Sequence, residues 1–167
     1  MAAQIPPRKQ REASGPLAAP RHAPLPAAPP LVLVAEDHED TRFLLRTLLE
    51  HRGLSVAEAA DGEEALRLAE CLRPGLVLMD GSLPRLDGFA VTRLMRESAS
   101  LSDIPVVFLS GHAEPRFKAL AREAGCADYL VKPIDLAQFD RLLSRHFSQT
   151  PRADQTPPRG PQEFLKP

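Results

Sequence analysis

Three short, uninterrupted apolar runs constrain the fold of this chain more than any other feature of its sequence. They are rich in Val and Leu and lie at residues 31–35, 76–80 and 105–110. A continuous apolar run of strand length indicates a strand that is covered on both faces, which is typical of a parallel sheet. Two weaker strands are expected at residues 54–57 and 128–131, where a mixed pattern suits the edges of the sheet.

Helical patterns alternate with these strands along the chain. They cover about residues 41–52, 61–72, 87–97, 115–125 and 135–147. Asp61 and Glu64 have the spacing of a capping box, and Gly53 and Gly125 are typical of helix C-terminal ends. The inward faces of the first and last helices are expected to contain Phe43, Leu44, Leu45, Leu48 and Leu49, and Leu136, Phe139, Leu142 and Leu143, respectively.

Five successive strand–helix units predict an α/β fold. We expect one doubly wound, five-stranded parallel sheet with helices on both faces, joined by right-handed crossovers. Ligands of such sheets bind beyond the carboxyl ends of the strands, at the point where the strand order reverses. Functional residues are therefore expected immediately after the strands.

Prolines divide the chain unevenly. Eight of the 18 lie in residues 1–30 and five lie in residues 148–167, and neither segment has apolar periodicity. We expect these segments to be disordered tails that flank one compact domain at residues 31–147. Both tails are net positive, so the total charge of −1 leaves the domain net acidic. That balance argues against direct DNA binding.

Other broad classes are excluded by simple patterns. No stretch of 18 or more apolar residues predicts a membrane span, and the N-terminal prolines do not suit a signal peptide, so a cytoplasmic location is expected. Cys71 and Cys126 lie far apart without CxxC spacing. They predict buried thiols rather than a disulfide or a zinc site.

Polar residues follow four of the five expected strands. Glu36 and Asp37 end the first, Asp80 the third, Ser110 the fourth and Lys132 the fifth. Carboxylates packed together repel one another unless a cation intervenes, and oxygen ligands favour Mg²⁺. A carboxylate nucleophile, a hard cation, an ammonium and a hydroxyl suit phosphoryl transfer to a carboxylate.

Each of these residues also has an ordinary structural role. Asp37 or Asp40 could cap the following helix, Asp80 could form a turn, Ser110 could be a strand-end hydroxyl and Lys132 a surface charge. Agreement among four separate strand ends favours the functional interpretation. Asp87 is expected to cap the third helix, because Pro84 and Gly88 bracket a turn.

The chain resembles the receiver domain of two-component response regulators over about residues 30–147. The matching segments are VAEDHED (34–40), LVLMDGSLPRLDGF (76–89), VVFLSGH (106–112) and GCADYLVKP (125–133). The resemblance implies a flavodoxin-like sheet with strand order 2-1-3-4-5. It also implies a cis peptide between Lys132 and Pro133.

The resemblance assigns roles position by position. Asp80 would accept a phosphoryl group from a histidine kinase or a histidine phosphotransfer protein. Mg²⁺, for which Mn²⁺ can substitute, would be bound by Asp80, by Asp37 directly, by Glu36 through a water molecule, and by the Ser82 backbone carbonyl. Glu36 stands where the family more commonly has Asp.

The remaining roles concern the signal. Lys132 would pair with a phosphoryl oxygen, Ser110 would move to bind another, and Tyr129 would turn inward with it. Ser82 and His112 lie two residues after the acceptor and the switch hydroxyl, and this pair is predicted to set the phosphoryl lifetime. His112 could equally be an exposed loop residue, and His38 is expected only to mark a helix start.

These roles predict a single-domain response regulator that is not an enzyme in the usual sense. Its output would be a changed protein-binding surface over about residues 113–147. A phosphotransfer intermediate or phosphate sink without such an output is the alternative. A phosphatase of related topology is disfavoured, because Ser82 stands where a second Asp would be expected.

Overall fold

The computed structural model describes residues 28–147, which form five strands and five helices in alternation. The strands are β1 (Leu31–Ala35), β2 (Ser55–Ala59), β3 (Leu76–Asp80), β4 (Val106–Ser110) and β5 (Asp128–Val131). The helices are α1 (Glu39–Glu50), α2 (Gly62–Leu72), α3 (Gly88–Glu97), α4 (Pro115–Glu123) and α5 (Leu136–His146).

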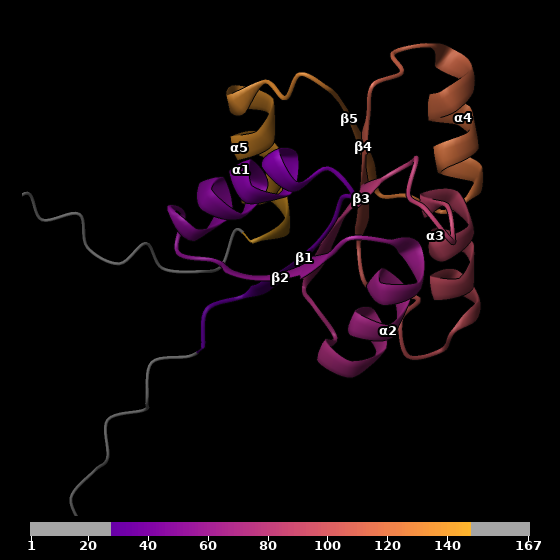
Figure 1. The fold of residues 1–167 in the computed structure, drawn as a ribbon, viewed down its shortest axis with the longest axis horizontal. Helices are drawn as coiled ribbons and strands as arrows, with labels where there is room; N and C mark the ends of the chain where they lie inside the picture. Colours follow the sequence, from indigo (N-terminus) through magenta and orange to yellow (C-terminus); the bar gives the residue numbers. More distant parts are fainter. Residues whose placement is uncertain (1–27, 148–167) are drawn as a thin grey trace, which may run out of the picture.

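The strands form one parallel sheet in the order β2-β1-β3-β4-β5. Helices α1 and α5 cover one face, and α2, α3 and α4 cover the other (Figure 1). The predicted doubly wound α/β fold and its strand order are therefore confirmed. The order reverses between β1 and β3, which places a ligand site at the carboxyl ends of these two strands.

Alternate residues of the central strands enter two separate cores. Val32, Val34 and their equivalents in β3 and β4 pack against Leu45 and Leu49 of α1 and against α5. The intervening residues pack against α2, α3 and α4. Because side chains alternate across a strand, a strand buried on both faces has to be apolar throughout. This is the physical reason for the uninterrupted runs.

Asp side chains begin three of the helices. Asp61, Asp87 and Asp135 each accept a hydrogen bond from the backbone N–H three residues later, at 2.7–2.8 Å. The Glu64 carboxylate in turn accepts from the N–H of Ala60, which lies just before the cap. The predicted helix starts at Asp61 and Asp87 are confirmed.

Several expected apolar contacts are absent. Phe43 and Leu44 of α1 are 57% and 53% exposed, and Leu136 at the start of α5 is 52% exposed. Only the Leu45 and Leu49 stripe of α1 is fully buried, because a helix on a sheet buries a narrower arc than the sequence pattern suggested. Cys71 is exposed rather than buried, and Cys126 is half-buried.

Several element boundaries differ from the expected ones by one or two residues, most notably those of β2 and α1. Strand β2 continues through Glu58 and Ala59, which pair with Val34 and Ala35 of β1, and the Glu58 side chain forms ion pairs with arginines of α1. Helix α1 begins two residues earlier than expected and has two acidic residues in its first turn.

The two predicted tails, residues 1–30 and 148–167, lie almost wholly outside the described residues. Within residues 28–147, no helix is long and apolar enough to cross a membrane.

Candidate functional site

The register of the sheet brings the predicted polar residues to one edge. Ala35 lies beside Met79, so Glu36 and Asp80 follow as neighbours at the ends of β1 and β3. Asp80 pairs with Leu109, and the next residue of β4 is Ser110. The Lys132 N–H, just beyond β5, donates to the Ser110 carbonyl at 2.8 Å.

Three carboxylates meet at this edge. One oxygen from each of Glu36, Asp37 and Asp80 lies within 4.8 Å of the other two. Glu36 is 1% exposed and Asp80 is 8% exposed, whereas Asp37 is open to solvent. All the donors are hard oxygen atoms, one acid is reachable from solvent, and the group is compact. The donor set therefore fits Mg²⁺.

Lys132 supplies the positive charge of the cluster. Its Nζ lies 2.6 Å from Glu36 Oε2 and 3.5 Å from Asp80 Oδ1. Burial raises the pKa of the Glu36 carboxyl, the hydrogen bond from Lys132 opposes this, and the nearby Asp80 adds to the rise. The ammonium therefore only partly neutralises the carboxylates.

The loop between β3 and α3 carries Ser82 and is held close to Asp80 by glycines. A Cβ on Gly88 would lie 2.2 Å from the backbone oxygen of Asp80, so the start of α3 approaches the end of β3 too closely for any side chain. The Gly88 N–H donates to the Gly81 carbonyl at 3.3 Å. Ser82 itself is exposed.

The same loop is fastened to the start of α2. The Gly62 N–H donates to the Pro84 carbonyl at 3.3 Å, and a Cβ on Gly62 would overlap the Leu86 carbonyl. Arg85, in the left-handed region at φ 64°, extends its guanidinium to within 3.2 Å of the capping Asp61 carboxylate. The loop conformation therefore depends on a neighbouring helix.

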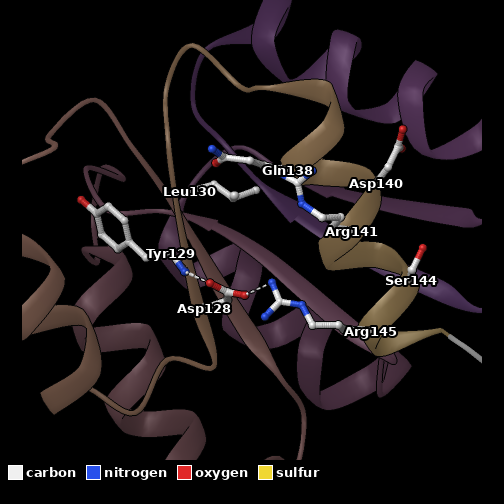
Figure 2. Close-up of a pocket in the computed structure, with 8 residues that line it drawn as sticks. All are labelled: Asp128, Tyr129, Leu130, Gln138, Asp140, Arg141, Ser144 and Arg145. Carbon is white, nitrogen blue, oxygen red and sulfur yellow. Dashed lines mark hydrogen bonds and ion pairs between the residues drawn. The ribbon is translucent and has the colours of Figure 1, made fainter.

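His112 links the two predicted switch residues through its backbone. Its N–H donates to Ser110 Oγ at 3.1 Å, and its carbonyl accepts from the Tyr129 hydroxyl at 2.7 Å. The imidazole stacks on Phe117 of α4 with ring centroids 4.1 Å apart, and Nδ1 lies 3.7 Å from the Glu114 carboxylate. In this conformation Tyr129 points away from α5 (Figure 2).

An open pocket lies beside this region, between β5 and α5. Figure 2 shows its lining, in which Arg145 reaches Asp128 at 2.6 Å and Leu130 points toward α5. It belongs to the 113–147 segment that was predicted as an output surface. It contains none of the predicted acceptor or metal-binding residues.

The alternative of simple helix capping is not supported for Asp37 or Asp40. Helix α1 has His38 as its N-cap, without a side-chain capping hydrogen bond, and Asp40 lies inside the first turn. Asp87, in contrast, is a helix cap as predicted. The peptide between Lys132 and Pro133 is cis, also as predicted.

Arg42 was missed by sequence reasoning. Its guanidinium donates to the backbone carbonyls of Glu36 and Asp37, and it also faces Glu58 of β2. No residue pattern signals bonds to backbone carbonyls across a turn. Only the position of Arg42, in the first turn of the helix that follows the acidic pair, could have pointed to it.

Comparison with known proteins decides the family. The family sequence model of the response regulator receiver domain matches residues 32–144 of this chain. The chain belongs to the response regulator receiver family. Receiver domains are signalling domains of two-component systems rather than enzymes in the usual sense, and membership implies a histidine kinase as a partner.

Individual relatives agree with this assignment. The polar-differentiation response regulator DivK of Brucella anthropi is 36% identical over 118 residues, which cover 71% of this chain and 96% of DivK. The chemotaxis response regulator CheY4 of Vibrio cholerae has a similar structure, with a TM-score of 0.67, 27% identity, and coverage of 71% of this chain and 98% of that one.

A third neighbour bears on the metal. The receiver domain of a sensor histidine kinase from Pseudomonas aeruginosa is described with a magnesium ion coordinated in its active site cleft. It is 34% identical, with a TM-score of 0.66, and the match covers 71% of this receiver chain and 97% of that domain. Receiver domains bind Mg²⁺ in an acidic cleft, and this chain has an acidic cluster at the corresponding edge of its sheet.

Proposed function

We propose that Asp80 accepts a phosphoryl group from a phosphohistidine donor, in a reaction that depends on Mg²⁺. The observation that carries this proposal is the meeting of Glu36, Asp37 and Asp80 with the Lys132 ammonium at one edge of the sheet. The receiver domain is proposed to span residues 31–147, which the family match over residues 32–144 supports.

Asp37 and Asp80 would hold the metal, with Glu36 and the Ser82 carbonyl completing the protein contribution. Bound Mg²⁺ supplies positive charge that offsets the negative charge on the transferring phosphoryl oxygens. Its arrival would also relieve the repulsion among three carboxylates that Lys132 only partly neutralises. Asp80 is nearly buried, so its oxygens are held in place by the surrounding fold.

The transfer itself exchanges one bond for another. A carboxylate oxygen of Asp80 forms a bond to phosphorus while the bond between phosphorus and the imidazole nitrogen of the donor breaks. The electron pair of the broken bond stays on that nitrogen, which is protonated by solvent. Lys132 is already 3.5 Å from Asp80, so its ammonium can leave Glu36 and pair with a phosphoryl oxygen.

The new charge would change the loop between β4 and α4. A phosphoryl group adds roughly −1.5 to −2 charges, and the Ser110 hydroxyl is a donor for one of its oxygens. Movement of Ser110 toward the phosphoryl group would end its contact with the His112 N–H, and His112 holds the Tyr129 hydroxyl. The signal would therefore reach residues 113–147, where a protein target would bind.

Phosphoryl uptake from phosphoramidate, followed by intact mass measurement, tests the acceptor. Wild-type protein with Mg²⁺ should gain the mass of one phosphoryl group, and chelation of the metal should prevent this. Asp80→Asn should gain nothing. Asp87→Asn is the matched control, because Asn also caps helices well and Asp87 lies in the same loop, so this variant should be phosphorylated normally.

Two results would contradict the proposal. One is phosphorylation of Asp80→Asn to the wild-type extent, and the other is uptake by wild type that is unaffected by metal removal. A phosphorylated protein whose backbone NMR spectrum is unchanged over residues 113–147 would instead favour a phosphate sink without a surface output.

A further inference from the structure

Arg42 connects the acidic end of β1 to strand β2. Its Nη1 lies 2.8 Å from the Glu36 carbonyl oxygen and 3.3 Å from the Asp37 carbonyl oxygen. Its Nε lies 3.6 Å from Glu58 Oε1, and the side chain is only 18% exposed. One guanidinium therefore contacts the backbone of both acidic residues and is itself fixed by a neighbouring strand.

The backbone of Glu36 is consequently held from both sides. Its N–H donates to the Ala59 carbonyl of β2 at 3.0 Å, and its carbonyl accepts from Arg42. In the turn that follows, the N-cap residue of α1, His38, makes no side-chain capping hydrogen bond, although its backbone hydrogen-bonds the Glu36 carboxyl. Arg42 thus stabilises a turn that the helix start leaves without a cap.

We propose that Arg42 is a positioning residue for the Mg²⁺ site, an inference that rests on the proposed function. It acts on the backbone carbonyls of the two residues whose carboxylates enter the acidic cluster, and it fixes the direction in which those carboxylates leave the turn. Outer partners that orient metal ligands in this way contribute strongly to metal affinity.

The charge of Arg42 opposes this effect. A cation near the site would by itself repel Mg²⁺, so its removal could tighten binding. Glu58 pairs with Arg42 at 3.6 Å but with Arg46 at 2.8 Å, so the two arginines and Glu58 together keep a net charge of +1. On this inference, orientation of the turn outweighs the repulsion that remains, and loss of Arg42 weakens Mg²⁺ binding.

Arg46 provides a matched control on the same helix face. It forms the shorter ion pair with Glu58 and lies over the Phe43 ring at 5.1 Å. Within residues 28–147, its side-chain hydrogen bond goes to the Glu58 carboxylate at 2.8 Å and not to a carbonyl of the β1–α1 turn. Arg46→Met and Arg42→Met both remove an arginine that pairs with Glu58, but only Arg42→Met releases the backbone of the acidic pair.

Titration calorimetry with Mg²⁺ on the full chain measures the effect without any phosphoryl donor. Arg42→Met should bind Mg²⁺ about tenfold more weakly, at the low end of the range for outer partners of metal ligands. Arg46→Met should stay within twofold of wild type. Arg42→Lys keeps the charge but cannot reach both carbonyls and Glu58 together, so its affinity should fall between those of wild type and Arg42→Met.

Thermal unfolding separates positioning from general destabilisation. Loss of Mg²⁺ affinity in a folded Arg42→Lys protein, together with a similar melting temperature for both Met variants, supports the inference. Wild-type affinity in Arg42→Lys, tighter binding in Arg42→Met, or equal weakening in Arg46→Met would overturn it. A wild-type protein that binds no Mg²⁺ would overturn the metal dependence of the proposed function, and this inference with it.

Discussion

Replacement of Gly88 by Ala tests how tightly the start of α3 is packed against Asp80. The added Cβ would lie 2.2 Å from the backbone oxygen of Asp80 and 2.9 Å from Met79 Cγ. The nearer of these atoms, the Asp80 oxygen, belongs to the backbone at the end of a central strand, so it cannot rotate away as a side chain could. Either the start of α3 or Asp80 must therefore move.

The expected cost follows from two opposing effects. Overpacking a buried position costs about 1–3 kcal/mol, and a backbone obstacle favours the upper end of that range. Ala is the better helix former by at most about 1 kcal/mol. The free energy of unfolding of Gly88→Ala should therefore fall by about 2 kcal/mol, which for a domain of this size lowers the melting temperature by about 8 °C.

Circular dichroism melts of Gly88→Ala and Gly111→Ala check this value. Gly111 also follows a strand end at the site, but a Cβ there would have nothing within 4 Å and its φ is not left-handed. Gly111→Ala should therefore melt within a few degrees of wild type, at most about 0.5–1 kcal/mol from it. Equal melting temperatures for the two variants would refute the close-approach reasoning.

Two further substitutions probe the electrostatics and the switch. The folded-state pKa of Glu36 is raised above its ordinary value of 4.5, so the stability that its protonated form contributes is complete below pH 4.5 and is lost as pH rises through the raised pKa. Without Mg²⁺, Glu36→Gln should lack this decline in stability. Thermal melts of wild type and Glu36→Gln at increasing pH above 4.5 check this, and melting temperatures that change with pH in parallel for the two proteins would contradict the prediction. Tyr129→Phe removes the hydrogen bond to the His112 carbonyl that holds the ring outward. If that bond is worth about 1 kcal/mol, the variant should bind beryllium fluoride, a phosphoryl mimic, up to about fivefold more tightly with Mg²⁺ present. Weaker or unchanged binding would show that this bond does not restrain the switch.

The site could be predicted from sequence because its residues follow strands. Asp80 and Ser110 are the last residues of the third and fourth strands, Lys132 directly follows the fifth, and parallel strands end at the same edge. The sequence pattern of the fifth strand is weaker than those of the central strands, but Lys132-Pro133 still marks where this strand ends. What sequence could not supply was which partner Lys132 takes, since that depends on the side-chain distances at the assembled edge.

Exposure on the helices was harder to predict than their existence. The pattern of α1 placed five apolar residues on one face, yet Phe43 and Leu44 are exposed. Periodicity gives the angular position of a side chain on its own helix. It does not give the width of the arc that a twisted sheet covers, which depends on both partners.

The sequence by itself determined the α/β alternation, the edge of the sheet that carries the site, and the chemical character of that edge. These follow from local rules: apolar runs form buried strands, and polar residues stand where those strands end. Only the tertiary structure decided that Arg42 holds the Glu36 and Asp37 carbonyls, that His112 joins Ser110 to Tyr129, and that Gly88 lies against Asp80. Each of these contacts involves a backbone group, which every residue has, so no side-chain pattern in the sequence could signal it.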